Sequence, residues 1–418
     1  MKNNAVFTIV AKNYIGLAQI ERDSVLRYSP DVDFHIFVAD EPELPVPSDS
    51  HIHVSRHTLD YEETEWTDMA FKYNLTEFCT AIKPACFQYL FGQGYQRVVF
   101  IDPDIYAFSS FAPLFQRLEQ YDMLLTPHIV GLHTEYNGQQ PEWTFNTSGV
   151  FNLGFCGMAD TPLIRHFLQW WRVRLQDNAF TDRSVGNFTD QKWMNWAPAL
   201  LGEKLCVVRD LGVNVAPWNY FEREIIKEKD QLCVRFRDKE NGEQCSPLMF
   251  VHYSGYNYSL LMKGEIDHQR LNFSEYADIA VLNDAYREAL VAGQATFEAF
   301  IHLTYSYATY DNGATIDAFH RRLYHGLKMQ GEDVGNPFAT AGHSFYASLK
   351  RSGMVAAQNT DKLTPQNYNG MDENIKRLNV FYKWLFRLIG YKRYPLFLKS
   401  MLAVHCRPEN HTFLLKKK

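Results

Sequence analysis

The chain has 418 residues, of which 46% are hydrophobic and 15% aromatic, and its formal net charge is −6. This composition excludes an intrinsically disordered protein, and the mildly acidic balance argues against nucleic acid as a partner. The length is enough for one large hydrophobic core or for two to three domains. In the sequence, no apolar run approaches the roughly 18 residues that a membrane-spanning helix needs.

The seven cysteines are scattered along the chain and contain no C-x-x-C pair. This spacing predicts neither a zinc site nor a disulfide framework. The first four residues lead directly into a strand-like run, without the apolar segment and cleavage site of a secretory signal. We therefore expect reduced thiols and a cytoplasmic protein.

Strand-like and helix-like segments alternate over the first part of the chain. The strand-like run 5–10 ends at Ala11, Asn13 and Tyr14, and after a helical pattern a second strand-like run ends at Asp40. A strand, a helix and a strand with polar groups at the strand ends are typical of nucleotide-binding α/β sheets. The sequence has no glycine-rich dinucleotide motif after the first strand and no Walker A motif, so a different grip on a diphosphate is expected.

A second polar turn follows the apolar run 97–101. The pattern predicts a long helix over residues 74–91, which includes Lys83, and then a buried parallel strand that stops at Asp102-Pro103-Asp104. Residues two apart in an extended segment point the same way, so both carboxylates could face one hard cation that holds phosphate oxygens. The alternative is a solvated turn, because Asp and Pro are common turn residues.

Three further motifs follow in the next part of the chain, and each has an ordinary alternative. The segment 146–155 contains Asn146 and Asn152 and could be a simple turn; Asp190-Gln191 could begin a helix, with Thr189 as the cap. His252, three residues before Gly255, could be a structural histidine. 

Two aromatic residues and a charged stretch lie between these motifs. Trp218 and Tyr220 could stack on a sugar ring, with core packing as the alternative. The charged stretch that runs from there to residue 243 predicts a β-hairpin or an insertion.

Taken in chain order, these motifs resemble the GT-A glycosyltransferases, and among them the retaining family 8 type that includes glycogenin and the bacterial lipooligosaccharide galactosyltransferases. The resemblance implies an α/β fold of the GT-A kind, Rossmann-like, with a mostly parallel sheet flanked by helices. It also implies a hexosyltransferase that moves a sugar from an NDP-sugar donor to a glycan acceptor with retention of configuration.

The same resemblance implies a role for each motif. Asp102, Asp104 and His252 would hold Mn²⁺ or Mg²⁺ through the DxD motif and the histidine, and the metal would neutralise the leaving diphosphate. Asp190 and Gln191 would be the catalytic pair beneath the anomeric carbon, with the amide stabilising charge because it is a poor nucleophile. The donor-binding residues would be Ala11, Asn13, Tyr14, Asp40, Lys83, Asp102, Asn146, Asn152, Gly255 and Lys263.

The chain departs from the family at one phosphate-binding position, and two other functions stay open. Tyr258 stands where the family has a lysine, so Lys83 or Lys263 would have to substitute. An inverting transferase would use Asp190 as the general base. A non-catalytic scaffold could use the same fold to bind a sugar or a nucleotide.

The chain beyond residue 270 is predicted to be helical. Residues 1–270 form the expected nucleotide-sugar transferase domain, 271–351 a helical subdomain and 352–374 a linker. Residues 375–418 contain eleven basic residues and one acid, interleaved with large apolar side chains. This pattern predicts an amphipathic helix on an anionic membrane surface, which would place the protein peripherally at the inner face of the membrane with a lipid-linked or cell-surface saccharide as acceptor. The alternative is a tail that packs on the chain's own acidic domain or on a partner protein.

Overall fold

The computed structural model describes residues 3–40, 49, 51–238, 241–242, 244–268, 272–355 and 371–415, with the backbone alone for 371–373. The chain divides into two compact units. The first unit comprises residues 1–61 and 75–305, and the second comprises residues 62–74 and 306–418. These divisions differ from the expected domain boundaries at 270 and 351.

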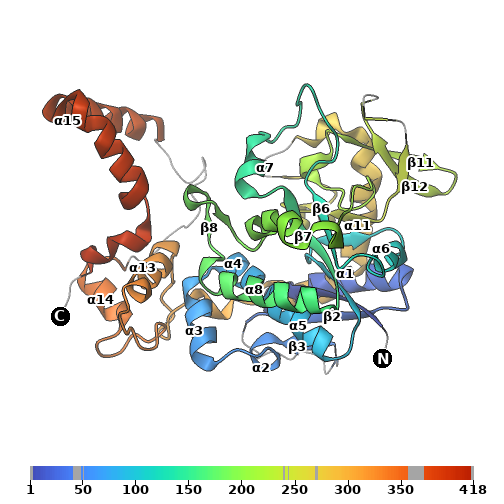
Figure 1. Cartoon of the computed structure of the whole chain (residues 1–418), viewed down its shortest axis with the longest axis horizontal. Coiled ribbons are helices and arrows are strands. Elements are labelled where there is room, and N and C mark those ends of the chain that lie inside the picture. The colour runs from blue at the N-terminus through green and yellow to red at the C-terminus, as the bar shows by residue number, and fades with distance from the viewer. Residues whose placement is uncertain are drawn as a thin grey trace. The chain divides into compact units, whose positions relative to one another are not determined.

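In the described residues of the first unit, a seven-stranded sheet runs in the order β10-β6-β7-β4-β1-β2-β3. All neighbouring strands pair in parallel except β7, which is antiparallel to both β4 and β6. The expected α/β architecture with a mostly parallel sheet flanked by helices is therefore confirmed (Figure 1). The strands are β1 (Asn4–Val10), β2 (Asp33–Val38), β3 (Ile52–Val54), β4 (Arg97–Ile101), β6 (Met123–Pro127), β7 (Phe151–Ala159) and β10 (Leu205–Val207).

Strand β1 is buried on both faces, because helices cover both sides of the sheet. Val6 and Val10 share a core with α1 (Ile15–Tyr28). On the other face, Phe7 meets Phe87 edge-to-face, with 4.8 Å between the ring centroids. Phe87 belongs to α5 (Lys83–Gly92), which lies beside α8 (Pro162–Asn178) (Figure 1).

The single long helix predicted over 74–91 is two helices, α4 (Leu75–Ala81) and α5. Pro84 lies in the first turn of α5, where its missing amide hydrogen costs no hydrogen bond. Ile82 separates the two helices as the N-cap of α5.

Two helices beyond residue 270 also belong to the first unit. The steps of three and four in the sequence bury Leu282, Tyr286 and Leu290 along α11 (Ala280–Ala292), and Gly293 follows as its C-cap. Together with α12 (Gln294–Ile301), these side chains share one core with α1. This shared core is the physical reason why the first unit extends past residue 270.

Two small sheets complete the first unit. Strands β5 (Ile105–Ala107) and β14 (Phe250–His252) pair in antiparallel fashion. The predicted β-hairpin is β11 (Arg223–Glu228) and β12 (Gln231–Phe236), to which β13 (Cys245–Pro247) adds a third antiparallel strand. All seven cysteines are free thiols.

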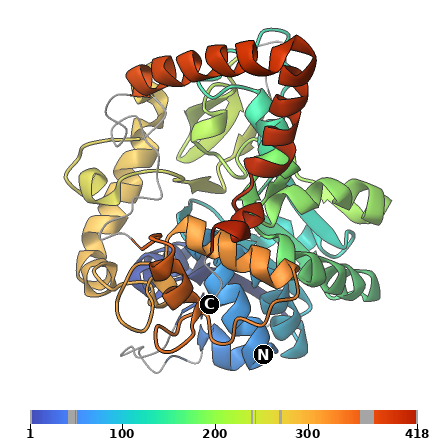
Figure 2. The ribbon, with the colours of Figure 1, turned by 90° about the vertical axis from the view of Figure 1, so that its left-hand side faces the viewer.

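The second unit is helical. Phe71 of α3 (Glu63–Lys72) packs in one core with residues of α13 (Ala318–Met329) and α14 (Phe345–Arg351). The chain then forms α15 (Met371–Ser400), whose two helical pieces meet at a bend (Figure 2). The bend follows from Gly390, whose φ of 73° is outside the helical range.

The predicted linker and tail are described in part. Residues 356–370 of the linker and Lys416 to Lys418 of the tail lie outside the described residues. Of the helices in the parts of the chain that the structure describes, none combines the length and the apolar character needed to cross a bilayer.

Candidate functional site

The loop after β4 gathers three possible metal ligands. β14 pairs with β5 in the register that places His252 opposite Ile105, directly beside the Asp102-Pro103-Asp104 turn. His252 Nε2 lies 2.9 Å from Asp104 Oδ1 and 3.8 Å from Asp102 Oδ2. One ligand atom from each of the three residues lies within 4.8 Å of the others. Two carboxylates and one imidazole at these distances could hold a divalent cation.

Several carboxyl groups lie close to one another at this cluster. Burial raises the pKa of Asp102 to about 6, against the lowering effects of Lys83 and His252. Burial alone would lower the pKa of His252, but Asp104 and Asp102 raise it above its ordinary value. Glu21 on α1 is also fully buried, and burial, followed by Asp104 and Asp102, raises its pKa well above the usual range. A bound cation would relieve the repulsion between the carboxylates of Asp102 and Asp104.

The backbone of β7 supports the histidine. A Cβ atom at Gly154 would lie 2.4 Å from Cε1 and 2.7 Å from Nδ1 of the His252 ring. The ring therefore packs directly against the glycine, and no larger residue fits without moving it. The amide of Asp102 donates to the carbonyl of Gly154 (2.9 Å), so the same residue also fixes the start of the acidic loop.

Lys83 and Asp190 form a buried ion pair, with 2.5 Å between Nζ and Oδ2. Lys83 also donates to the carbonyl of Leu153 (2.9 Å), and its Nζ lies 3.8 Å from the centre of the Phe100 ring. The ammonium thus ties α5 to β7 and to the segment that carries Asp190. The charged partner of Lys83 in this structure is therefore the carboxylate of Asp190.

Asp190 occupies the N-cap position of a short helix, as the helix-cap alternative predicted, but a capping side-chain contact is absent there among the described residues. The short 3₁₀ helix η3 (Gln191–Trp196) begins after Asp190, whose side chain makes no capping hydrogen bond. Thr189 has a φ of 47° and cannot act as the expected cap in that conformation. A β-branched residue in the left-handed region is strained, and such strain is concentrated at functional sites.

Gln191 is buried, and both ends of its amide make hydrogen bonds. Oε1 accepts from the backbone amide of Leu153 (3.1 Å), and Nε2 donates to the carbonyl of Ser148 (3.0 Å). Asn152 Nδ2 lies 3.5 Å from the same Oε1, and Asn152 Oδ1 accepts from Asn214 Nδ2 (3.0 Å). These bonds join Gln191 to Asn152 and to the backbone of β7, and so hold both side chains in place.

Two cavities flank the cluster, and Gly255 lines both. The first has a volume of about 320 Å³, and its walls include Asn152, Gln191 and Trp218. The second has a volume of about 400 Å³ and extends from Asp102 and Asp104 to the end of β1. The remaining walls of the second cavity are Ile9, Val10, Ala11, Tyr14, Leu75, Thr76, Cys79, Thr80, Pro103, Tyr256 and Tyr258.

Some of the predicted donor-binding residues line these cavities and others do not. Ala11, Tyr14, Asp102, Asn152 and Gly255 are wall residues. The wall residues of the two cavities do not include Lys83, Asn13, Asp40, Asn146 or Lys263.

These remaining residues have other positions in the described structure. Asp40 is buried and accepts from the amide of Lys12 (2.8 Å), so it holds the turn that carries Tyr14. The side chain of Asn13 has a buried Oδ1 with no hydrogen-bond partner among the described residues. Asn146 on α7 (Trp143–Ser148) and Lys263 at the end of α10 (Tyr258–Met262) are both exposed.

Sequence reasoning missed several residues of the site. Thr76, Cys79 and Thr80 line the second cavity from one face of α4, at the i, i+3, i+4 spacing that could have identified them. His128 and Arg183 line the first cavity and had no sequence signal. Asn214, which has a φ of 58° and donates to Asn152 Oδ1, was given no role from the sequence.

The two aromatic candidates separate in the structure. Tyr220 is fully buried in the core, as the alternative predicted. Trp218 lines the first cavity and contacts the His252 ring edge-to-face, with 5.1 Å between centroids. Its Nε1 is buried without a hydrogen-bond partner among the described residues.

The chain is similar to one curated protein and to several solved structures. No protein-family model matches it. An uncharacterized protein of Bacillus subtilis (strain 168), YfnF, is 24% identical over 217 residues, which are 51% of this chain and 67% of that protein.

The solved structures to which the chain is similar include three glycosyltransferases. The galactosyltransferase LgtC, in complex with donor and acceptor sugar analogs, is 16% identical with a TM-score of 0.40, covering 72% of this chain and 97% of that one. Mouse xyloside xylosyltransferase 1 is 14% identical with a TM-score of 0.34, covering 52% and 88%. The glycosyltransferase GlyE of Streptococcus pneumoniae TIGR4 is 11% identical with a TM-score of 0.36, covering 74% and 67%. At these identities and TM-scores, the similarities assign no activity to this chain.

Proposed function

We propose that the chain is a metal-dependent GT-A glycosyltransferase that moves a sugar, expected to be a hexose, from an NDP-sugar to a glycan acceptor with retention of configuration. The observation that carries this proposal is the cluster of Asp102, Asp104 and His252 between two cavities. A nucleotide and a sugar joined by a diphosphate need this arrangement: a cation site in the middle and a chamber on each side.

The second cavity suits the nucleotide. It lies at the carboxyl ends of β1 and β4, where open α/β sheets bind their ligands. Tyr14 and Tyr258, 6.4 Å apart between ring centroids, give this cavity aromatic walls that can pack on a base or a ribose. Tyr258 supplies no positive charge, so the diphosphate would be neutralised mainly at the metal cluster.

The cluster fits a divalent cation such as Mn²⁺ or Mg²⁺. Its donors are two carboxylates and a histidine whose ring is fixed by Gly154 and Trp218. When bound, such an ion supplies charge neutralisation for the leaving diphosphate. The chain's own part is to hold the three ligands in place and to exclude water from their buried side.

The first cavity suits the transferred sugar and the acceptor. Trp218, Phe145 and Phe188 offer apolar faces, while Gln191 and Asn152 offer amide groups to sugar hydroxyls. The amide of Gln191 is held in place by bonds at both ends and is not nucleophilic, so its role would be to stabilise positive charge that develops at the anomeric carbon.

The surroundings of Asp190 favour retention over the inverting alternative. Its Oδ2 is paired with Lys83 (2.5 Å), and the hydroxyl of Thr189 lies 3.2 Å from its Oδ1. A general base must be within hydrogen-bond reach of the acceptor hydroxyl. A carboxylate engaged at both oxygens is poorly placed to accept the proton of the acceptor hydroxyl.

We also propose that the tail of the second unit binds an anionic membrane surface, which would make the enzyme peripheral at the cytoplasmic face and a lipid-linked or cell-surface saccharide its acceptor. Leu378, Phe381, Trp384 and Leu388 follow one another at near-helical spacing, and each is between 49% and 65% exposed. The described basic residues of the same tail are Lys376, Arg377, Lys383, Arg387, Lys392, Arg393, Lys399 and Arg407. An exposed apolar stripe with basic flanks is the pattern of interfacial helices.

A panel of NDP-sugars tests the proposed activity. We expect one donor to raise the unfolding temperature in the presence of Mn²⁺, and that donor to be hydrolysed slowly or transferred to a saccharide acceptor. NMR of the product should show the anomeric configuration of the donor. An inverted product would favour the inverting alternative, and donor binding without any turnover would favour the scaffold.

A further inference from the structure

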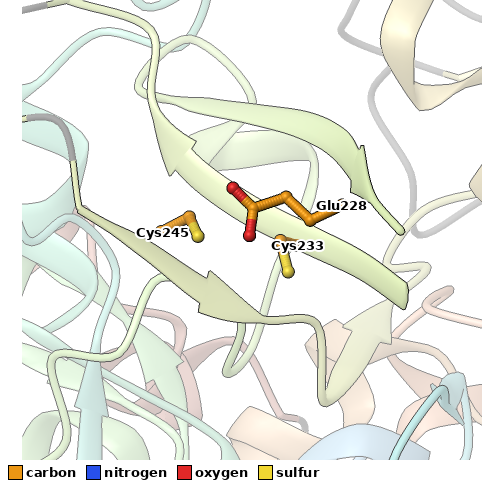
Figure 3. Close-up of side chains that lie close together, drawn as sticks. All are labelled: Glu228, Cys233 and Cys245. Carbon is orange, nitrogen blue, oxygen red and sulfur yellow. The ribbon is translucent and has the colours of Figure 1, made fainter. Parts of the chain in front are cut away.

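A second group of metal-ligating side chains lies on the three-stranded sheet of the first unit, on strands apart from the acidic loop. Glu228, Cys233 and Cys245 each offer a ligand atom, and these atoms lie within 4.8 Å of one another (Figure 3). Glu228 is the last residue of β11, Cys233 lies in the middle of β12, and Cys245 begins β13.

Strand register explains why these three residues meet. Cys233 is opposite Ile226, and Glu228 lies two residues beyond Ile226 on the same face of β11. Cys245 is opposite Arg235, two residues beyond Cys233 on β12. All three side chains therefore project from one face of the sheet, and the long side chain of Glu228 reaches across β12 toward β13.

This face is opposite the one that packs on the protein core. Ile225 and Val234, which project from the other face, are buried members of a large hydrophobic cluster. The face with the thiols also carries the ion pair of Arg235 with Glu224 (2.7 Å between N and O). Core packing therefore does not explain why two cysteines and a glutamate gather here.

We infer that Glu228, Cys233 and Cys245 bind a thiophilic divalent cation of the Zn²⁺ class. Zn²⁺ binds thiolate sulfur at about 2.3 Å and carboxylate oxygen at about 2.0–2.2 Å, so donors at the observed separations can surround one ion with small side-chain adjustments. Cys233 is buried, Cys245 is half-buried and Glu228 is exposed, so the ion can enter from the Glu228 side. Water would complete the fourth position. The two sulfur ligands separate this site chemically from the oxygen and nitrogen donors of Asp102, Asp104 and His252.

Such an ion would link β11, β12 and β13 through one ligand from each strand. β11 and β13 do not pair with each other, because β12 lies between them. The thiol of Cys245 and the carboxylate of Glu228 already lie close together across this gap. A shared ion would replace that weak contact by metal–ligand bonds that join all three strands, and so would raise the stability of the sheet.

Titration of the purified, reduced full-length chain with Co²⁺ tests the site. Thiolate ligands give Co²⁺ a near-ultraviolet charge-transfer absorption, which the oxygen and nitrogen donors of the acidic loop do not. We expect this absorption to saturate at one Co²⁺ per chain and to disappear when Zn²⁺ is added. Cys245→Ser should remove the band, and Glu228→Gln should weaken Zn²⁺ binding by tenfold or more in competition with a chelating dye. 

Two control variants locate the effect. Cys406→Ser removes an exposed thiol outside the cluster and should leave the band unchanged. Asp104→Ala should also leave it unchanged, so the result is independent of the proposed transferase metal. Both cluster variants alter residues that are not fully buried, and a matched melting temperature without metal shows that they fold. A wild-type chain without the band, or a band that persists in Cys245→Ser, would overturn the inference.

Discussion

The acidic loop of the first unit and the helix α15 of the second differ in how their residues come together. Asp104 and His252 are 148 positions apart in the sequence and meet only because β14 pairs with β5. The stripe of Leu378, Phe381 and Trp384 is made by one helix alone. The first arrangement depends on the tertiary structure, whereas the second is readable from local spacing. Mutations in the loop should therefore act through geometry, and mutations in α15 through charge and apolar area.

The largest effect should come from removing one carboxylate of the loop. We expect Asp104→Ala to lower transfer by at least about 1,000-fold, because one metal ligand and the partner of His252 are lost together. Initial rates with the donor found in the panel measure this loss. Asp23→Ala, which removes an exposed carboxylate on α1, is the matched control and should keep full activity. Activity in excess EDTA equal to that with metal would contradict the metal cluster.

Gln191→Ala should lower kcat by about 100-fold with little change in the donor KM, since the amide is proposed to act on charge that develops in the transition state. Steady-state kinetics separate the two constants. Asn195→Ala is the nearby control: Asn195 accepts from the amide of Val150 (3.1 Å) and is not among the walls of the two cavities. A Gln191 variant with a raised KM and unchanged kcat would show that the residue only binds substrate.

Breaking the Lys83–Asp190 pair should destabilise the first unit. Lys83→Met leaves a buried carboxylate without its cation, which costs about 3–5 kcal/mol in the free energy of unfolding. Replacing both partners, with Lys83→Met and Asp190→Leu, should recover most of that loss, although activity should stay low. Urea denaturation of the two single variants and the double variant measures the coupling. Additive losses would mean that the ion pair contributes little.

Gly154→Ala tests how closely the β7 backbone positions His252. The added methyl group would lie 2.4 Å from the ring, so the ring must move, and we expect a loss of about tenfold in Mn²⁺ affinity. Gly157→Ala on the same strand is the control, because its methyl group would meet Leu124 at 3.3 Å and not the histidine. Equal metal affinity in both variants would contradict a positioning role for Gly154.

The smallest effects are expected in α15, where single charges act near a surface. Each cation near an anionic bilayer contributes on the order of 1 kcal/mol, and salt weakens this attraction. Removal of the residues after 374 should abolish co-sedimentation with anionic liposomes at low salt while sparing donor hydrolysis. Replacing Leu378, Phe381 and Trp384 by Ser keeps every charge and should weaken binding in part. Equal pelleting of the truncated and full-length chains would favour a tail that packs on protein.

Much of the sheet could be predicted, because buried parallel strands are continuous apolar runs. β1, β2 and β4 lie where such runs occur, and the acidic loop follows β4 directly. The prediction of one continuous helix over 74–91 was wrong, because Pro84 lies in the first turn of a separate helix. The boundary of the first unit could not be predicted from the sequence, because α11 and α12 pack on α1 through contacts between residues more than 250 positions apart.

The functional residues show the same limit. The three proposed metal ligands were identified by their order in the chain, but the pairing of Lys83 with Asp190 needed the tertiary structure, since nothing local links α5 to the segment before η3. Likewise, no spacing rule connects Cys233 with Cys245, which approach only through the register of β12 and β13. Sequence patterns report local geometry well and strand register poorly.

Calorimetric titration of UDP and GDP into the full-length chain tests the central claim most directly. If Asp102, Asp104 and His252 hold a cation that grips the donor diphosphate, at least one nucleotide should bind with Mn²⁺ present. The affinity should fall at least about tenfold in EDTA, and Asp104→Ala should bind equally weakly with and without metal. Nucleotide binding that is equally tight in EDTA and in Mn²⁺ would contradict the account.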